Sequence, residues 1–185
     1  VRRSRNDYGH EKDCALTDYH IEARPGRSYV LDQFAGLVPS VMHEEPHWQA
    51  NRMVANAAWF GFDELRENNR TAWQEIWKGR PVLVGAPQRW QEISDSSFFY
   101  THSSIHPSSI HGIAPFGLSH ENYHGHVFWD CETFMYPGVL MTAPAAARAS
   151  MEYRFECLPR ARHNAKLHGF RGVQFPWQSG NSGAE

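Results

Sequence analysis

The chain has 185 residues, of which 41% are hydrophobic and 21% charged, and its formal net charge is −2 with histidine neutral. This composition is typical of a folded globular protein and excludes an intrinsically disordered one. No stretch combines clustered Lys and Arg with aromatic residues, and no apolar run is long enough to cross a membrane, so neither nucleic acid nor a membrane is expected as a partner. The three cysteines, Cys14, Cys131 and Cys157, are odd in number and widely spaced, which argues against a disulfide framework and favours a cytoplasmic location.

The N-terminal part of the sequence predicts a β-rich region. Residues 1 to 26 show no sustained hydrophobic period and are expected to form loop with at most a short strand. The segment from Arg27 to Val41 begins after the turn formers Pro25-Gly26 and ends near Pro39-Ser40, which predicts the last strand of that region.

A helical region follows from Pro46 to Arg80. Its apolar positions recur at steps of three or four residues, or small multiples of them, as on one face of a helix: Val54, Ala58, Phe62, Leu65, Trp73 and Ile76. One long helix and two helices are both compatible with this pattern. Gly61 weakens the first half, and Thr71 with Gln74 matches a capping box that would open a second helix. The short run from Pro81 to Gly85 predicts a strand or an extended link.

Two further helices are predicted. Pro87 to His102 has helical character, and the loop of about twenty residues after it is longer than most connections, which favours a functional role. The next helix is expected to begin at an N-cap, Thr142, with Pro144 in its first turn. Pro159 should kink or split it, and Gly169 should end it. Its predicted apolar stripe consists of Ala147, Met151, Phe155, Leu158, Ala161 and Ala165.

The stretch from Gly125 to Pro137 concentrates aromatic residues, a histidine and two carboxylates. Trp129 beside Asp130 supplies what a carbohydrate site needs, a flat apolar face to cover a sugar ring and a carboxylate to accept hydrogen bonds from its hydroxyls. The alternative is that Phe128, Trp129 and Phe134 are only core residues, because most buried aromatic side chains serve packing.

Two other features bear on function. Trp177 beside Gln178 forms a second Trp-polar pair in a C-terminal segment that is otherwise loop. His124-Gly-His126 together with Asp130 could supply three zinc ligands of the right chemical types, although their spacing is not diagnostic of a metal site. A metal-dependent hydrolase is therefore the rival enzyme interpretation.

Four blocks of the sequence resemble glycoside hydrolase family 65, which holds the maltose, trehalose and kojibiose phosphorylases, the acid trehalases and the glucosidase acting on glucosyl-galactosyl-hydroxylysine. The blocks are Gly117-Leu-Ser-His-Glu-Asn-Tyr-His-Gly-His-Val-Phe-Trp-Asp-Cys-Glu132, Glu152-Tyr-Arg-Phe, Leu158-Pro-Arg-Ala-Arg and Phe175-Pro-Trp-Gln-Ser-Gly. The resemblance implies a mainly α fold, the opening part of an (α/α)6 toroid preceded by the last strands of an N-terminal β-sandwich and a helical linker. It divides the chain into the end of a β-rich domain (residues 1–41), the linker (residues 42–80) and the N-terminal portion of the catalytic domain (residues 81–185).

The resemblance also implies a site. In the family the Phe-Trp-Asp segment lies in subsite −1, where the aspartate is expected to hold glucose hydroxyls. Gln178 stands where many family phosphorylases have Glu, so the hydrogen-bonding shape is kept and the charge is lost. The implied substrate-binding residues are His126, Phe128, Trp129, Asp130, Glu132, Trp177 and Gln178.

The activity that the resemblance implies is inverting hydrolysis or phosphorolysis of the α-glucosidic bond in disaccharides such as trehalose or maltose, by a full-length protein that forms a homodimer. No cofactor is implied, and inorganic phosphate would be the co-substrate of a phosphorylase. The family's general acid, a Glu within Asp-Glu-Tyr-His, does not occur in this sequence and is expected beyond Glu185, so the isolated chain is expected to be inactive. A catalytically inactive sugar-binding fragment is the third interpretation.

Overall fold

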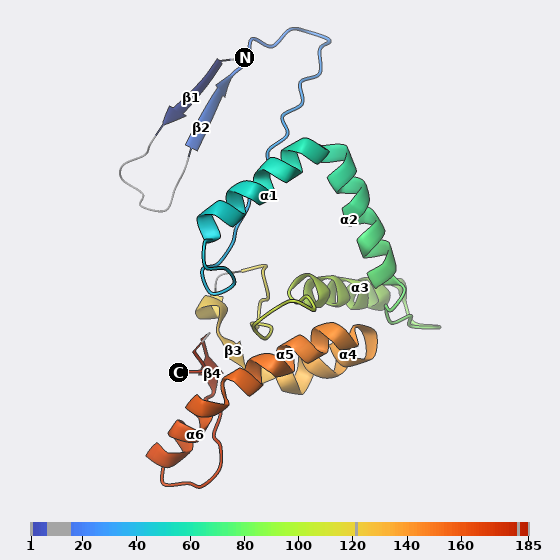
Figure 1. Ribbon diagram of the computed structural model, residues 1–185. Coiled ribbons are helices and arrows are strands. Elements are labelled where there is room, and N and C mark those ends of the chain that lie inside the picture. The colour runs from blue at the N-terminus through green and yellow to red at the C-terminus, as the bar shows by residue number, and fades with distance from the viewer. Residues whose placement is uncertain (1, 7–15, 121, 181, 185) are drawn as a thin grey trace. The chain divides into compact units, whose positions relative to one another are not determined.

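The protein is described by a computed structural model that covers residues 2–6, 16–120, 122–180 and 182–184. The chain divides into two compact units, Val1–Ala35 and Gly36–Glu185. The described residues are mainly helical, as predicted (Figure 1). Within them, no helix is both long and apolar enough to cross a membrane.

The first unit contains a β-hairpin. β1 (Arg2–Asn6) pairs antiparallel with β2 (Leu16–His20), so that Arg2 lies opposite His20 and Asn6 opposite Leu16. Two short strands therefore fall within the stretch that was expected to be loop with at most one strand.

The strand predicted over Arg27 to Val41 is wrong, because the backbone of this segment is irregular. A strand is stable only when a neighbouring strand pairs with it, and none of the described strands does so here. The apolar side chains that suggested the strand remain exposed, with Val30 at 86% and Leu31 at 60%.

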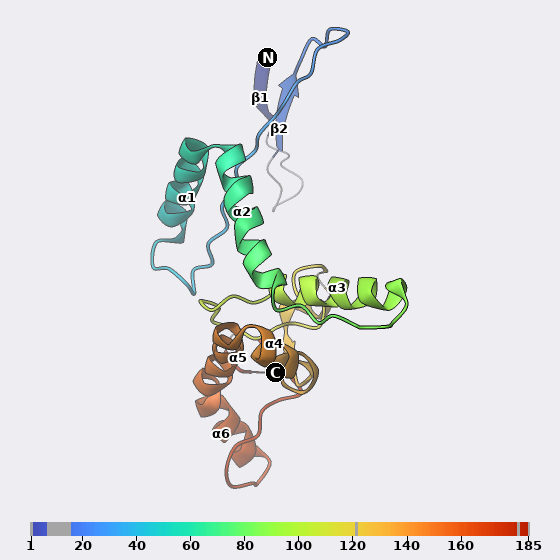
Figure 2. The same ribbon diagram turned by 90° about the vertical axis from the view of Figure 1, so that its right-hand side faces the viewer.

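The helical region forms two helices, α1 (Pro46–Phe60) and α2 (Phe62–Trp77). They meet at a sharp bend at Gly61 (Figure 1, Figure 2), whose φ of 82° lies in the left-handed region that glycine adopts without strain. The capping box predicted at Thr71 is wrong, since α2 continues through that residue. Neither helix buries a residue fully.

α3 (Gln88–Ser103) confirms the next predicted helix, and an extended link with a turn precedes it. Aromatic side chains join α2 to α3. The ring centroids of Trp73 and Phe99 are 4.9 Å apart, and those of Trp77 and Phe98 are 5.1 Å apart. These offset contacts stabilise the helix pair although most of its outer surface is open.

Three helices complete the fold, α4 (Tyr136–Thr142), α5 (Pro144–Glu156) and α6 (Leu158–Leu167). The predicted break at Pro159 is confirmed, because this proline lies in the first turn of α6, where its missing N–H costs nothing. Gly169 follows α6 with a φ of 77°, as expected of a helix end. Thr142 is not the cap of α5, because it is the last residue of α4, and its hydroxyl lies 2.8 Å from the Gly138 carbonyl oxygen.

The core is formed by α4, α5 and the segment of residues 105–131, whose buried side chains belong to one cluster. The buried residues at steps of three, four and seven place one face of α5 inward, and all but the last are small: Ala146, Ala149, Ser150 and Tyr153. The predicted stripe was therefore partly wrong: Ala147, Ala161 and Ala165 are buried, whereas Phe155 is 68% exposed. The main buried cluster contains Ile105, Ile113, Val127, Cys131, Val139, Ala146, Ala147, Tyr153 and Cys157.

His102 ties α3 to α4 and makes the stability of the fold depend on pH. Its Nδ1 lies 2.9 Å from the Phe98 carbonyl, and its Nε2 lies 2.9 Å from Thr142 Oγ1. Burial lowers the pKa of His102 and outweighs the opposing effect of the Phe98 hydrogen bond. As the pH decreases below the ordinary histidine pKa of about 6.5, this imidazole is protonated in the unfolded chain while it is still neutral in the folded chain. The free energy of unfolding therefore decreases as the pH decreases.

We expect the thermal unfolding midpoint to decrease as the pH is lowered from about 7.5 to about 5.5, because the His102 imidazole then protonates preferentially in the unfolded chain. The variant His102→Gln should show a smaller decrease over the same range, whatever its midpoint at neutral pH. His163→Gln, which changes an exposed histidine on α6, serves as the control and should keep the wild-type slope. Equal slopes in all three proteins would contradict the assignment.

Candidate functional site

A two-residue β-bridge brings the two Trp-polar pairs together. β3 (Val127–Phe128) pairs antiparallel with β4 (Gln178–Ser179), with Val127 opposite Ser179 and Phe128 opposite Gln178. The two strands lie beside each other next to α5 (Figure 1). Trp129 directly follows β3 and Trp177 directly precedes β4, so the antiparallel register places both tryptophans at the same end of the bridge.

The two tryptophans form one aromatic surface. Their ring centroids are 5.2 Å apart and the ring planes are tilted by 60°. Trp129 is 49% exposed and Trp177 57% exposed. The Trp129 Nε1–H donates to the Pro176 carbonyl at 2.9 Å, which fixes the ring against the second segment.

The interpretation of these aromatics as core residues holds for one of them. Phe128 is buried, whereas Trp129 is half-exposed and Phe134 is largely exposed. The Phe128 and Trp177 rings are nearly perpendicular, with centroids 6.4 Å apart. Phe128 therefore supports the aromatic surface from beneath.

The turn before β3 carries backbone strain. Tyr123 and His124, in the short helical turn η1 (Asn122–Gly125), have φ angles of 63° and 53°. Such left-handed conformations cost non-glycine residues about 1–2 kcal/mol each. Ring contacts oppose this cost, because Tyr123 packs against Phe116 at 5.9 Å and against Phe128 at 5.1 Å. Strain held in place by packing is common at functional sites.

Asp130 lies at the start of a π-helical turn, η2 (Cys131–Met135). Turns of this kind occur often at functional sites. The side chain is half-buried, and no hydrogen bond joins its carboxylate to another residue that the structure describes. The carboxylate of Asp130, the residue that follows Trp129, is thus available to accept hydrogen bonds from a ligand.

Glu132, the second carboxylate of the segment, is engaged by an arginine. Arg154 Nε donates to one Glu132 oxygen at 2.9 Å, and a terminal nitrogen donates to the other oxygen at 2.9 Å. The Arg154 side chain is 9% exposed and that of Glu132 28% exposed. This bidentate pair gives Glu132 a structural role. The predicted contact of Glu132 with a sugar stays a prediction.

His126 and Gln178 face each other across the bridge. The His126 Nδ1 and the Gln178 Oε1 are 3.4 Å apart, a long hydrogen bond. The ring centroids of His124 and His126 are 6.4 Å apart. Within the described part of the chain, no group of three His, Cys, Asp or Glu side chains is arranged to hold a metal ion, so the rival zinc-site interpretation has no supporting geometry there.

Cys131 is not available as a nucleophile. It is buried, and its sulfur accepts from the Ile113 N–H at 3.3 Å. Burial raises the pKa of the Cys131 thiol, which keeps it protonated and unreactive.

Three residues important to this arrangement were not among the predicted site residues, namely Tyr153, Arg154 and Ser179, although they lie in two of the sequence blocks that resemble family 65. The Tyr153 hydroxyl lies 2.8 Å from Ser179 Oγ and donates to the Gly180 carbonyl at 2.8 Å. Ser179 is completely buried. The small residues at the inward positions of α5 could have placed Tyr153 in the core, but no local pattern indicated the partners of Arg154.

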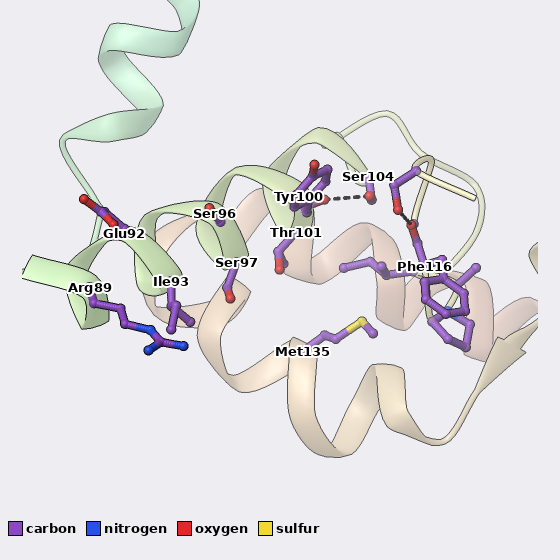
Figure 3. Close-up of a pocket in the computed structure, with 15 residues that line it drawn as sticks. Arg89, Glu92, Ile93, Ser96, Ser97, Tyr100, Thr101, Ser104, Phe116 and Met135 are labelled. Carbon is purple, nitrogen blue, oxygen red and sulfur yellow. Dashed lines mark hydrogen bonds between the residues drawn. The ribbon is translucent and has the colours of Figure 1, made fainter.

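A separate pocket of about 660 Å³ lies between α3 and the 113–119 loop. Figure 3 shows Arg89 at one end of it, Phe116 at the other and Met135 across from α3. Its wall is rich in hydroxyl groups, from Ser96, Ser97, Tyr100, Thr101, Ser104 and Ser119. None of the seven predicted site residues lines this pocket. The candidate site, formed by the exposed tryptophans and Asp130, is therefore separate from it.

Comparisons with known proteins agree with the resemblance seen in the sequence. The family model of the glycosyl hydrolase family 65 central catalytic domain matches residues 97–185. This part of the chain belongs to glycoside hydrolase family 65. Every predicted site residue falls within the family 65 region.

The chain is similar to proteins with several named activities. It is 32% identical over 175 residues to a kojibiose hydrolase of Flavobacterium johnsoniae, covering 95% of this chain and 26% of the relative. It is 38% identical over 130 residues to a protein-glucosylgalactosylhydroxylysine glucosidase of Gallus gallus, covering 65% of this chain and 18% of the relative. It is 32% identical over 184 residues to a kojibiose phosphorylase of Thermoanaerobacter brockii, covering 94% and 23%.

The fold is also similar to a solved structure, assigned as a kojibiose phosphorylase from human microbiome. The TM-score is 0.66 and the sequence identity 26%, over 77% of this chain and 20% of the other. The mainly helical fold and this match confirm the expected fold class, a portion of the (α/α)6 toroid of family 65. The chain spans about a quarter of the length of the kojibiose hydrolase and the kojibiose phosphorylase described above.

Proposed function

We propose that Trp129, Asp130 and Trp177 hold a glucose unit in the substrate site of a family 65 enzyme that acts on α-linked glucose disaccharides. The observation that carries the proposal is the pairing of two exposed tryptophan rings, 5.2 Å apart. The residue after Trp129 is Asp130, whose carboxylate has no hydrogen-bond partner among the described residues. The rings offer apolar area to the C–H face of a sugar, and the carboxylate accepts from its hydroxyls. Family membership supports this use of the site.

Kojibiose is the first substrate to test. Relatives of the chain include a kojibiose hydrolase and kojibiose phosphorylases, and others act on a glucosylgalactosyl substrate. Trehalose and maltose, which the sequence resemblance implied, belong to the same chemical class and serve as comparison substrates.

The reaction proposed is cleavage of the α-glucosidic bond with inversion. A general acid protonates the leaving oxygen, and water activated by a second carboxylate, or inorganic phosphate, attacks the opposite face of the glucose ring. The contribution of the described site is to bind and orient the glucose unit. We propose no metal or organic cofactor, and phosphate enters only as a co-substrate.

The substitution Asp130→Asn should weaken binding of kojibiose about 10- to 100-fold. It keeps the shape of the side chain but removes charged acceptors, and a hydrogen bond to a charged group contributes about 1.5–3 kcal/mol. Isothermal titration calorimetry on the chain measures the change. Asp63→Asn, the same replacement at an exposed aspartate on α2, is the control and should bind as the wild type does. Wild-type affinity in Asp130→Asn would contradict the proposal.

Turnover distinguishes the two reactions. It is measured on the longest natural protein that contains this sequence, with and without inorganic phosphate. Release of glucose 1-phosphate only when phosphate is present would identify a phosphorylase, and release of two free sugars without phosphate a hydrolase.

A further inference from the structure

The buried Arg154 guanidinium connects three segments that surround the candidate site. Besides the two bonds to Glu132, it donates to Ser179 Oγ at 3.0 Å and to the Phe128 carbonyl at 3.2 Å. It also lies over the rings of Tyr153 and Phe175, at 5.3 and 5.8 Å from their centroids. One side chain of α5 therefore contacts the end of β3, the π-helical turn and β4.

The positions of these contacts relative to the sugar-binding residues are specific. Phe128 immediately precedes Trp129, and Ser179 immediately follows Gln178. Glu132 lies two residues after Asp130. The guanidinium thus binds the backbone or side chain next to each proposed binding segment, while its own side chain, at 9% exposure, is too buried to contact a sugar.

The bonds are also strong ones. A bidentate Arg–carboxylate pair is shorter and more directional than neutral hydrogen bonds. Burial acts to lower the pKa of Arg154, but the hydrogen bonds and charge of Glu132 raise it above its ordinary value. The guanidinium therefore remains charged, and its loss would leave Glu132 without its counter-charge.

We propose that Arg154 is a positioning residue for sugar binding, which holds the Trp129–Asp130 and Trp177–Gln178 segments in the register that binds glucose. The inference rests on the proposed function. It assigns to Arg154 an effect on ligand affinity that acts through the placement of Trp129 and is distinct from its contribution to folding.

The test compares two substitutions of Arg154 with a matched control on the same helix. Arg154→Met removes every hydrogen-bond donor of the side chain. Arg154→Lys keeps the positive charge but cannot form the bidentate pair with Glu132. Arg148→Met removes an exposed arginine of α5 that pairs with Glu152, four residues along. Affinity for kojibiose is measured by calorimetry, and the NMR signal of the Trp129 indole N–H, which donates to Pro176, reports the position of the ring.

We expect Arg154→Met to weaken binding on the order of 10- to 100-fold, because small displacements of binding groups have effects of this size. Arg154→Lys should weaken it by about 3- to 10-fold, since a single ammonium replaces a bidentate fork. Both variants should shift the indole signal, and Arg148→Met should change neither measurement. Should Arg154→Met fail to fold, Ser179→Ala, which removes one acceptor of Arg154, is expected to shift the same signal and weaken binding.

The outcomes separate the two proposals. Absence of kojibiose, maltose and trehalose binding by the wild-type chain would overturn the proposed function and this inference with it. Binding by the wild type that is unchanged in Arg154→Lys and in Ser179→Ala would overturn the inference alone. Weaker binding with an unmoved indole signal would also overturn it, because Arg154 would then act by a route other than the placement of Trp129.

Discussion

Replacement of Trp129 by alanine should weaken binding of α-linked glucose disaccharides about 30-fold. A sugar face that covers roughly 80 Å² of the indole would gain about 2 kcal/mol at about 25 cal/mol per Å², and about 1.4 kcal/mol corresponds to a factor of ten. Trp129 is half-exposed in the structure, so this area is available to a ligand. Calorimetric titration with kojibiose gives the dissociation constants.

Two further variants separate the roles of the ring. Trp129→Phe keeps an apolar face but loses the Nε1–H bond to Pro176, so it should show an intermediate loss. Trp177→Ala should also weaken binding, and the double variant should lose less than the sum, since the two rings lie 5.2 Å apart and would contact one ligand.

The control for these variants is Trp59→Ala. Trp59 is an exposed tryptophan of α1, at 81%, so its removal tests whether loss of any surface indole lowers the measured affinity. Equal affinity in Trp129→Ala, Trp177→Ala and the wild type would exclude the aromatic surface as a sugar platform.

The helices could be predicted from the sequence because their limits are local. Pro159 and Gly169 act within one or two turns of their own position, and the structure places helix boundaries next to both. The strand expected over Arg27 to Val41 failed for the opposite reason. Apolar residues between turn formers favour a strand, but the partner that stabilises it is a long-range property.

The residue pattern indicated two separate Trp-polar pairs, and only the resemblance to family 65 assigned both to one substrate site; the structure brings them side by side. Val127 and Ser179 pair across a bridge too short to show any alternation in the sequence. A two-residue strand has no detectable period, so proximity of Trp129 to Trp177 could not be inferred from hydrophobic pattern. The buried Arg154 was missed because arginine is rarely buried, and the partners that make burial tolerable lie 22 to 26 residues away.

The rigidity of the site depends on small residues. Ala146, Ala147 and Ala149 on α5 are almost completely buried. Small side chains let α4 and the segment around β3 approach the α5 backbone closely, and close packing leaves few alternative positions for the groups it carries. Close packing also means that an added atom destabilises the fold, and the contact between the 113–119 loop and α3 at Gly117 is an example.

Gly117→Ala should destabilise the protein by about 2–5 kcal/mol, the largest effect on stability that we expect from one methyl group. Gly117 has a φ of 53°, which costs an alanine about 1–2 kcal/mol. A Cβ at this position would lie 1.9 Å from Ser104 Oγ and 2.9 Å from Ser104 Cβ. Ser104 is buried and its hydroxyl donates to the Tyr100 carbonyl at 2.7 Å, so relief of the clash requires a shift of the loop against α3, at a typical overpacking cost of about 1–3 kcal/mol.

The backbone and steric contributions at Gly117 can be measured separately by urea denaturation. Gly169→Ala meets the same backbone penalty at a φ of 77° but has open space around the new Cβ, so it should lose only about 1–2 kcal/mol. In the double variant Ser104→Gly with Gly117→Ala the steric clash is absent, and the coupling energy between the two substitutions should be favourable by at least about 1 kcal/mol. If Gly117→Ala destabilises no more than Gly169→Ala does, the loop is free to move away from α3, and the close contact between Gly117 and Ser104 does not fix the position of this loop.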